Sequence, residues 1–212
     1  QMDRQFQLVF YIYMSFLATV LPPSIVWLVL RRLTDQLRHI AARDPMTQLL
    51  NRRGLTEALQ LSFNQRRAEH AHLLVVDVDH FKRINDTYGH HAGDTVLCRV
   101  AEILQATARR GDLVSRLGGE EFAVICLNTD FPGAMHMAER LRAAIETQTI
   151  DIAEGGHPLQ CTVTVGVSQG FADAHALEAA LQQADAALYR GKAAGRNRVE
   201  TAGPSMATPS YA

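Results

Sequence analysis

The chain has 212 residues, of which 47% are hydrophobic and 20% are charged, so we expect one ordinary globular domain with an appendage. Its formal net charge of −1 excludes a protein that binds nucleic acid through bulk positive charge, and we expect no nucleic-acid partner. Cys98, Cys126 and Cys161 lie in apolar runs, which is typical of small core residues in a reducing compartment and not of a disulfide framework.

A long apolar run opens the chain. Residues 8–30 contain no charged side chain, and these 23 residues suffice to cross a hydrocarbon core of about 30 Å. Arg31 and Arg32 follow at once, which places the C-terminal end of the run inside. A buried helix of a soluble protein and a signal peptide are the alternatives, but the run is long for a signal peptide and lacks a clear cleavage site. We predict a transmembrane helix over residues 1–30, and, because the chain opens on Gln1, the C-terminal part of a larger membrane receptor.

A signalling or dimerisation helix is predicted next, over residues 31–43. Leu30, Leu33, Leu37 and Ile40 recur at spacings of three and four, which is the a/d pattern of paired helices. So short a stripe also fits a helix that packs on its own domain. Its place beside a predicted membrane span favours pairing with a second copy.

Helices and strands alternate over residues 44–200, which we predict to form the globular domain. The patterns indicate helices over 53–67, around 81, and over 92–109, 132–147 and 177–194, with strands over 72–78, 113–117, 122–127 and 161–167. This order predicts an α+β fold similar to the ferredoxin-like palm: a mainly antiparallel central sheet flanked by helices, mainly on one side, and preceded by a long N-terminal helix. Residues 201–212 are predicted to be a disordered tail.

Two acidic clusters follow predicted strands. Asp77 and Asp79 end a buried strand, and Glu120 and Glu121 follow a glycine pair that suits the tip of a tight β-hairpin. Oxygen ligands at a strand end and a hairpin tip of one sheet suit Mg²⁺ that is held together with substrate phosphates. The pattern favours metal-assisted phosphoryl chemistry. Each cluster alone also fits a polar turn or a solvated surface, and Asp79 also fits a cap of the following helix.

Several motifs stand in a fixed order along residues 44–199. They are Asp44-Pro-Met-Thr47, Asp77-Val-Asp79-His-Phe-Lys82-x-x-Asn85-Asp86, Gly89-His90-x-x-Gly93-Asp94, Arg116-x-Gly-Gly-Glu-Glu-Phe, and Ala184-Asp185-x-Ala-Leu-Tyr189-x-x-Lys192-x-x-Gly195-Arg196-Asn197. Together they resemble the GGDEF family of diguanylate cyclases, whose palm is of the nucleotide cyclase type. Departures from the family pattern are Glu120 for the commoner Asp, Met46 and Gln48 for Leu and Gly, and Gly191 for Ala.

The resemblance implies an enzyme that condenses two GTP into cyclic di-GMP and releases two pyrophosphates. It implies that Asp77, Glu120 and the carbonyl of Val78 bind Mg²⁺, or Mn²⁺ in its place. Glu121 would complete the metal shell or assist deprotonation of the attacking ribose hydroxyl. The implied catalytic residues are therefore Asp77, Glu120 and Glu121.

Substrate binding is implied for a second set of residues. Guanine offers neighbouring N–H donors that suit Asp94, and an amide such as Asn85 can both donate and accept, so we expect GTP and not ATP. Taken alone, Asn85 also fits a turn and Asp94 a helix N-cap. The resemblance adds Phe81 to the nucleotide site and implies phosphate contacts for a set of cations: Lys82, Lys192 and Arg196.

A product-inhibition site is implied ahead of the hairpin. Arg109 and Asp112 match the family's Arg-x-x-Asp register relative to Gly118, so cyclic di-GMP would bind there, with Arg140 contributing from the same or the facing subunit. Taken alone, the pair also fits a charged helix end followed by a turn.

The expected enzyme is a homodimer in which each protomer holds one GTP. Its catalytic domain would lie in the cytoplasm, anchored to the inner (cytoplasmic) membrane by the N-terminal helix. The alternative is a catalytically degenerate domain that acts as a receptor for GTP or cyclic di-GMP. A palm-type adenylyl cyclase or polymerase would share the acids, but Asn85 with Asp94 and Arg109 with Asp112 favour the diguanylate cyclase.

Overall fold

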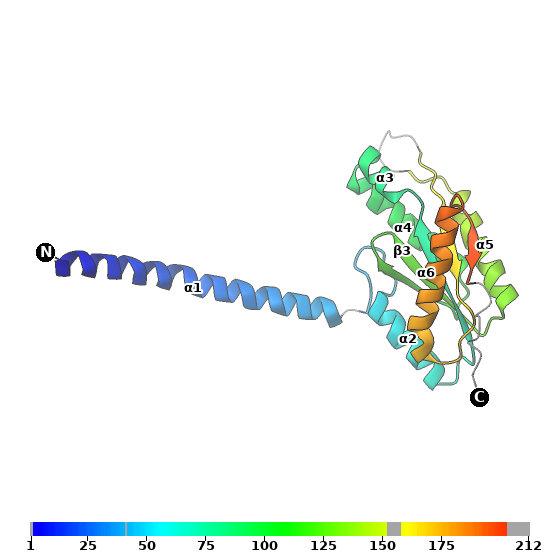
Figure 1. The fold of residues 1–212 in the computed structure, drawn as a ribbon, viewed down its shortest axis with the longest axis horizontal. Coiled ribbons are helices and arrows are strands. Elements are labelled where there is room, and N and C mark those ends of the chain that lie inside the picture. The colour runs from blue at the N-terminus through cyan, green and yellow to red at the C-terminus, as the bar shows by residue number, and fades with distance from the viewer. Residues whose placement is uncertain (1, 41, 152–157, 203–212) are drawn as a thin grey trace, which may run out of the picture. The chain divides into compact units, whose positions relative to one another are not determined.

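The computed structural model describes residues 2–40, 42–151 and 158–202 and consists of two compact units, Gln1–Ala41 and Ala42–Ala212. The first unit holds the 39-residue helix α1 (Met2–Ile40) (Figure 1). Within it, Arg4–Trp27 is long and apolar enough to cross a membrane, which by itself is weak evidence for a span. The side chains of the predicted stripe at Leu30, Leu33, Leu37 and Ile40, and most of the predicted tail, residues 203–212, lie outside what the structure describes.

The second unit is built on a five-stranded sheet. Its strands are β1 (Ala71–Val78), β2 (Leu113–Gly118), β3 (Glu121–Leu127), β4 (Val163–Val167) and β5 (Val199–Thr201), in the order β2-β3-β1-β4-β5. Neighbouring strands are antiparallel except β4 and β5, which are parallel. The mainly antiparallel sheet is therefore confirmed. Strand β5 is not predicted from the sequence, because three half-buried residues among charged neighbours give little periodic signal.

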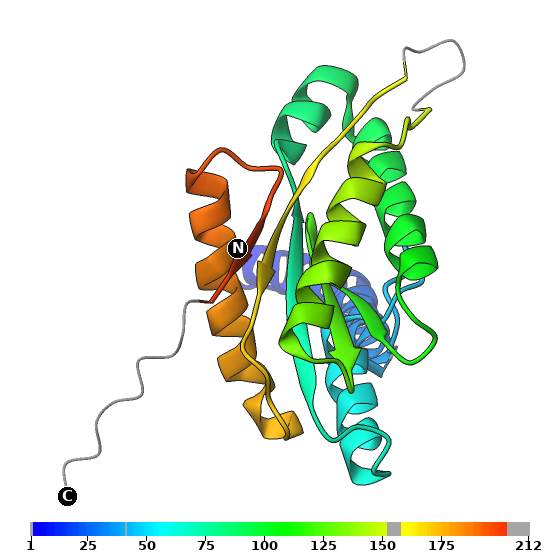
Figure 2. The ribbon, with the colours of Figure 1, turned by 90° about the vertical axis from the view of Figure 1, so that its right-hand side faces the viewer.

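Helices cover both faces of this sheet, so the expectation of helices mainly on one side is wrong. The helices are α2 (Arg52–Asn64), α3 (Phe81–Tyr88), α4 (His90–Thr107), α5 (Phe131–Glu146) and α6 (Leu177–Ala193), with a short 3₁₀ turn η1 (Ala174–Ala176) before α6. Side chains of β1 alternate between two cores: Leu74 packs with residues of α4 and α5, and Leu73 with residues of α2 and α6. Figure 2 shows α6, in orange, and α5, in yellow-green, on opposite sides of the sheet.

Local capping explains where several helices begin. The Asn51 side chain accepts a hydrogen bond from the Gly54 N–H at the start of α2, and Asp130 does the same for the Gly133 N–H at the start of α5. Helix α4 begins at His90, two residues before the predicted start, and follows Gly89, whose φ of 84° separates it from α3. The three cysteines are not disulfide-bonded in the described structure.

Candidate functional site

The end of β1 and the β2–β3 turn bring three carboxylates together. Asp77 in β1 pairs in register with Glu121, the first residue of β3. Glu120 lies in the turn beside Gly119, whose φ of 52° suits glycine, and the Val78 N–H donates to the Glu120 carbonyl at 3.3 Å. The predicted hairpin therefore exists, and its tip lies against the strand that carries Asp77.

These carboxylates lie in a site with excess negative charge. Asp77 is 3% exposed, and its Oδ2 lies 2.8 Å from Nζ of Lys192 on α6. Burial raises the pKa of Asp77 above its ordinary value, and the ion pair with Lys192 only partly offsets this. Burial, followed by repulsion from Asp77, likewise raises the pKa of Glu120 and of Glu121. A cation at this place would offset the repulsion among the three carboxylates and stabilise their charged forms.

The donor set fits a magnesium ion shared with a substrate. Asp77, Glu120 and Glu121 offer hard oxygen ligands, which Mg²⁺ prefers. In the described parts of the chain, no group of three His, Cys, Asp or Glu side chains converges closely enough to hold a metal ion alone. Mg²⁺ commonly takes one or two protein carboxylates and completes its shell with phosphate oxygens and water.

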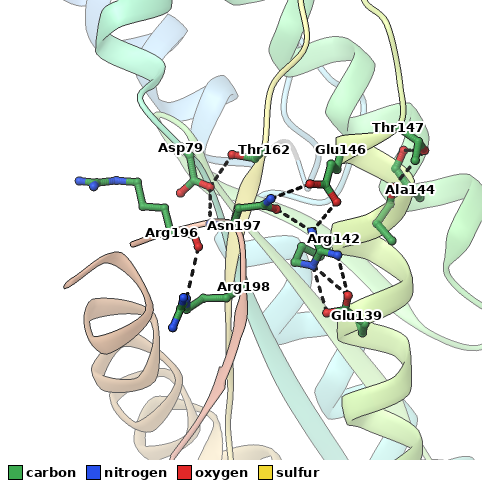
Figure 3. Close-up of polar contacts among 11 residues, drawn as sticks. Asp79, Glu139, Arg142, Ala144, Glu146, Thr147, Thr162, Arg196, Asn197 and Arg198 are labelled. Carbon is green, nitrogen blue, oxygen red and sulfur yellow. Dashed lines mark hydrogen bonds and ion pairs between the residues drawn. The ribbon is translucent and has the colours of Figure 1, made fainter. Parts of the chain in front are cut away.

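Asp79 belongs to a different set of contacts, and its expected alternative role as a helix cap is wrong. Its carboxylate, 3% exposed, accepts hydrogen bonds from the Thr162 hydroxyl at 2.8 Å and the Asn197 N–H at 3.0 Å (Figure 3). It also accepts one from the Thr164 hydroxyl at 2.6 Å. The residue before α3 is His80, for which the described chain shows no side-chain cap. Asp79 thus joins β1 to the segment before β4 and to the loop after α6.

Asn85 and Asp94 lie on the two helices that follow β1. Asn85 is in the last turn of α3, and its buried Oδ1 has no hydrogen-bond partner within the described residues. A side chain at Gly93 of α4 would collide with this Oδ1, so glycine leaves the amide its space. Asp94 lies within α4 and is exposed, so its alternative role as an N-cap is wrong. Phe81 is buried beside Gly93, at the start of α3.

The predicted phosphate-binding cations divide into two groups. Lys192, near the end of α6, and Arg196, in the loop after it, both stabilise the charge of Asp77. Arg196 has a φ of 63°, and the Lys192 side chain is 33% exposed. Lys82, in the first turn of α3, is exposed, and no described contact ties it to the carboxylates. Lys192 and Arg196 therefore lie near the carboxylates, whereas the phosphate contact expected of Lys82 stays a prediction.

The predicted inhibitory residues gather on another part of the surface. The Arg109 N–H donates to the Asp112 carboxylate at 2.9 Å, and the Asp112 N–H donates to the Arg109 carbonyl at 2.9 Å, which closes a tight turn after α4. Both line a cavity of about 270 Å³. Arg140 on α5 donates to the Thr107 carbonyl at 2.7 Å and is not among the residues of that cavity. Burial raises the pKa of the Cys126 thiol, the charge of Asp112 adds to this rise, and the charges of Arg109 and Arg140 partly offset it.

An ion pair that sequence reasoning did not assign holds the hairpin turn. Arg116 of β2 donates to the Gly119 carbonyl from Nη2 at 2.7 Å and to Asp44 Oδ1 from Nη1 at 3.2 Å. Burial alone would raise the pKa of Asp44, but hydrogen bonds from Thr47 and Arg116 hold it below its ordinary value. Asp44 and Arg116 each stand in a recognised motif, but they are 72 residues apart, so their contact depends on the tertiary fold.

Comparisons with known proteins agree with this geometry. The model of the family described as "Diguanylate cyclase, GGDEF domain" matches residues 41–198. The chain is 44% identical over 172 residues to diguanylate cyclase DgcP of Pseudomonas aeruginosa and 42% identical over 172 residues to diguanylate cyclase DgcM of Escherichia coli. Each match covers 80% of this chain but only 25% and 40% of those relatives, so the chain spans less than half of their length.

The fold is also similar to that of solved structures. The GGDEF domain of DgcB from Caulobacter crescentus, crystallised in complex with c-di-GMP, superposes with a TM-score of 0.68 at 31% sequence identity. That match covers 76% of this chain and 96% of the other.

Proposed function

Because the chain belongs to the GGDEF family, we propose that it is a diguanylate cyclase, which condenses two GTP into cyclic di-GMP and releases two pyrophosphates. The observation that carries the proposal is the meeting of Asp77 with the Glu120–Glu121 turn, beside two cations, Lys192 and Arg196. Clustered carboxylates select a divalent metal, and neighbouring cations select phosphate, so this arrangement suits a nucleoside triphosphate with its metal.

In the proposed mechanism, Asp77, Glu120 and the carbonyl of Val78 would hold Mg²⁺, or Mn²⁺ in its place. Such an ion would supply positive charge that neutralises the triphosphate and lowers the pKa of the attacking ribose 3′-hydroxyl. Glu121 completes the metal shell or accepts the proton of that hydroxyl. Lys192 pairs with Asp77 at 2.8 Å and is exposed enough to reach a phosphate oxygen when substrate binds. Arg196 offers two parallel N–H donors to the phosphates.

Guanine selection follows from one side chain of α3, Asn85, and one of α4, Asp94. The Asp94 carboxylate is an acceptor that suits the neighbouring N1–H and amino donors of guanine, and the Asn85 amide can donate as well as accept along the remaining edge. Adenine would set its N1 lone pair against a carboxylate. Phe81 and Lys82, at the start of α3, would flank the base and the phosphates.

Product inhibition is proposed at the turn Arg109–Asp112. The Arg109 guanidinium would bind the guanine or phosphate of cyclic di-GMP, and the Asp112 carboxylate would accept from the guanine edge. The cavity they line supports this role. Arg140 would contribute from its own or the facing subunit.

We further propose a homodimer at the cytoplasmic face of the inner membrane. Each cyclic product contains two nucleotides, so two sites must face each other, each holding one GTP. Helix α1 supplies an apolar segment, Arg4–Trp27, that supports an anchor, and residues 31–43 would set the geometry of the pair.

The test is to incubate the full chain with Mg²⁺ and GTP and to identify products by chromatography. The Glu120→Gln variant should make no cyclic di-GMP, whereas Glu102→Gln, an exposed change on α4, should leave the yield unchanged. A folded wild-type dimer that yields no cyclic di-GMP would exclude the enzyme. If that protein still bound GTP or cyclic di-GMP, a receptor function would replace the proposed cyclase activity.

A further inference from the structure

The loop between α6 and β5 carries Arg196, and a hydrogen-bonded cluster holds this loop from two sides. We propose that Asn197, Asp79, Arg142 and Glu146, here called the Asn197 clamp, act as positioning residues that direct Arg196 toward the phosphates of bound nucleotide. The inference rests on the proposed function and extends it to α5, which carries no recognised motif of the family.

The backbone of this loop adopts a conformation that needs external support. Gly195, Arg196 and Asn197 have φ values of 112°, 63° and 46°, in the left-handed region that residues other than glycine rarely adopt. Two consecutive non-glycine residues of this kind persist only where surrounding contacts determine them. The conformation of Arg196 therefore depends on what holds Asn197.

Asn197 uses both ends of its side-chain amide. Its Oδ1 accepts a hydrogen bond from Arg142 Nη1 at 2.6 Å, and its Nδ2 donates to Glu146 Oε1 at 2.7 Å (Figure 3). Its backbone N–H donates to Asp79 Oδ2 at 3.0 Å. These contacts reach two different elements, α5 and the end of β1, so they fix the loop in more than one direction.

Charged contacts within α5 hold the Arg142 and Glu146 side chains of the clamp. Arg142 has a side chain only 14% exposed, and it forms a two-pronged contact with Glu139 as well as an ion pair with Glu146 at 2.7 Å. The hydrogen bonds that Arg142 donates to Glu139 and Glu146 raise the pKa of Arg142, and hydrogen bonds donated by Arg142 and Asn197 lower the pKa of Glu146. Both groups are therefore charged at neutral pH and bond strongly to the amide between them.

The other half ties the loop to the metal-site strand. Asp79 follows β1 and stands two residues after Asp77, and its remaining contacts are to Thr162 and Thr164. Arg196 stabilises the charge of Asp77. In Figure 3 the Arg196 side chain extends away from the clamp, on the side opposite Arg142. The clamp therefore holds the backbone of Arg196 and does not engage its guanidinium, which can bind phosphate at the site.

A donor–acceptor exchange between two residues tests this inference. In Asn197→Asp, two carboxylates face each other where Nδ2 donated to Glu146, so the clamp opens. In Asn197→Asp/Glu146→Gln, the new amide donates to the new carboxylate, which still pairs with Arg142, and the net charge returns to that of the wild type. The probe is guanosine 5′-[(α,β)-methylene]triphosphate, which cannot release pyrophosphate, and guanosine serves as the ligand without phosphates. The full chain is titrated with each by calorimetry.

We expect Asn197→Asp to bind the triphosphate about tenfold more weakly, the double variant to recover most of this loss, and guanosine to bind all three proteins equally. Asn128→Asp is the matched control. Asn128 also has a left-handed φ, of 49°, and its amide accepts from the Glu69 N–H and donates to the Arg67 carbonyl, but it lies at the opposite end of β3 from Glu121. This control should lose stability and keep triphosphate affinity.

Equal triphosphate affinity of Asn197→Asp and the wild type would overturn the inference, as would a double variant that recovers nothing or an equal loss for guanosine. If Asn197→Asp does not fold by circular dichroism, Asn197→Gly takes its place, because glycine keeps the left-handed backbone and removes both side-chain bonds. A wild-type chain that binds neither ligand would instead overturn the proposed function, and the inference with it.

Discussion

Replacing Asp77 by alanine should abolish cyclic di-GMP synthesis while leaving the metal-free protein nearly as stable as the wild type. Asp77 and Lys192 lie 2.8 Å apart, and the gross attraction at that distance is roughly 6 kcal/mol for an effective dielectric constant near 20. Burial of Asp77 costs several kcal/mol in the opposite direction, and its raised pKa shows that burial outweighs the pairing.

The variant leaves no buried unpaired charge. Lys192 is 33% exposed and can turn to water, so we expect the free energy of unfolding to change by less than about 1 kcal/mol. The matched control is Asp79→Ala, which removes the same atoms from the residue that directly follows β1. It leaves the Asn197 N–H and the hydroxyls of Thr162 and Thr164 without their acceptor, at about 1 kcal/mol each and about 3 kcal/mol in all.

Urea unfolding of both variants in EDTA, followed by circular dichroism, measures the difference. A loss of about 3–5 kcal/mol for Asp77→Ala would mean that its ion pair is structural, and the account of a site poised for a cation would be refuted. An Asp79→Ala variant as stable as the wild type would refute the assignment of Asp79 to the loop contacts.

Three further predictions follow from burial and contact. Burial raises the pKa of Cys126 to about 12, roughly a thousandfold less thiolate than at the ordinary 9.0, so a thiol reagent should label Cys98 first and Cys126 only on unfolding. The folded pKa of Asp44 is depressed, so its contribution to stability should be complete at neutral pH and disappear as the pH falls through that value, below the ordinary 3.8; urea unfolding of the wild type and Asp44→Asn at several pH values measures it. Gly166→Ala should cost about 3 kcal/mol by thermal unfolding, because its methyl group would meet the Ala184 carbonyl on α6.

Each of these has a clear contrary result. Equal labelling rates for the two thiols would contradict the burial of Cys126. A stability difference between wild type and Asp44→Asn that persists to the lowest pH would mean that the carboxylate charge does not matter. An unchanged melting temperature for Gly166→Ala would mean that β4 and α6 are not in close backbone contact.

Much of the site could be predicted from local sequence. A buried strand that ends in acids, a glycine pair before two glutamates and the fixed spacing of the motifs are properties of short segments, and the structure forms the strand and the hairpin as expected. Hairpin geometry depends on two turn residues and strand burial on a run of apolar residues, so neither needs knowledge of the rest of the chain. The membrane span, the dimer and the roles of the site residues stay predictions.

The tertiary structure alone decided which contacts each acid makes. Asp77 and Asp79 are both buried acids at the end of one strand, and nothing local separates them. β1 ends at Val78, so Asp77 stays in register with Glu121 while Asp79 leaves the sheet and bonds to Asn197, 118 residues later. Only the tertiary structure brings Arg142 of α5 into contact with Asn197, 55 residues away. Only the tertiary structure likewise shows that helices cover both faces of the sheet. Contacts between residues so far apart depend on how the elements pack, because a periodic pattern marks only which face of an element is buried and not what covers it.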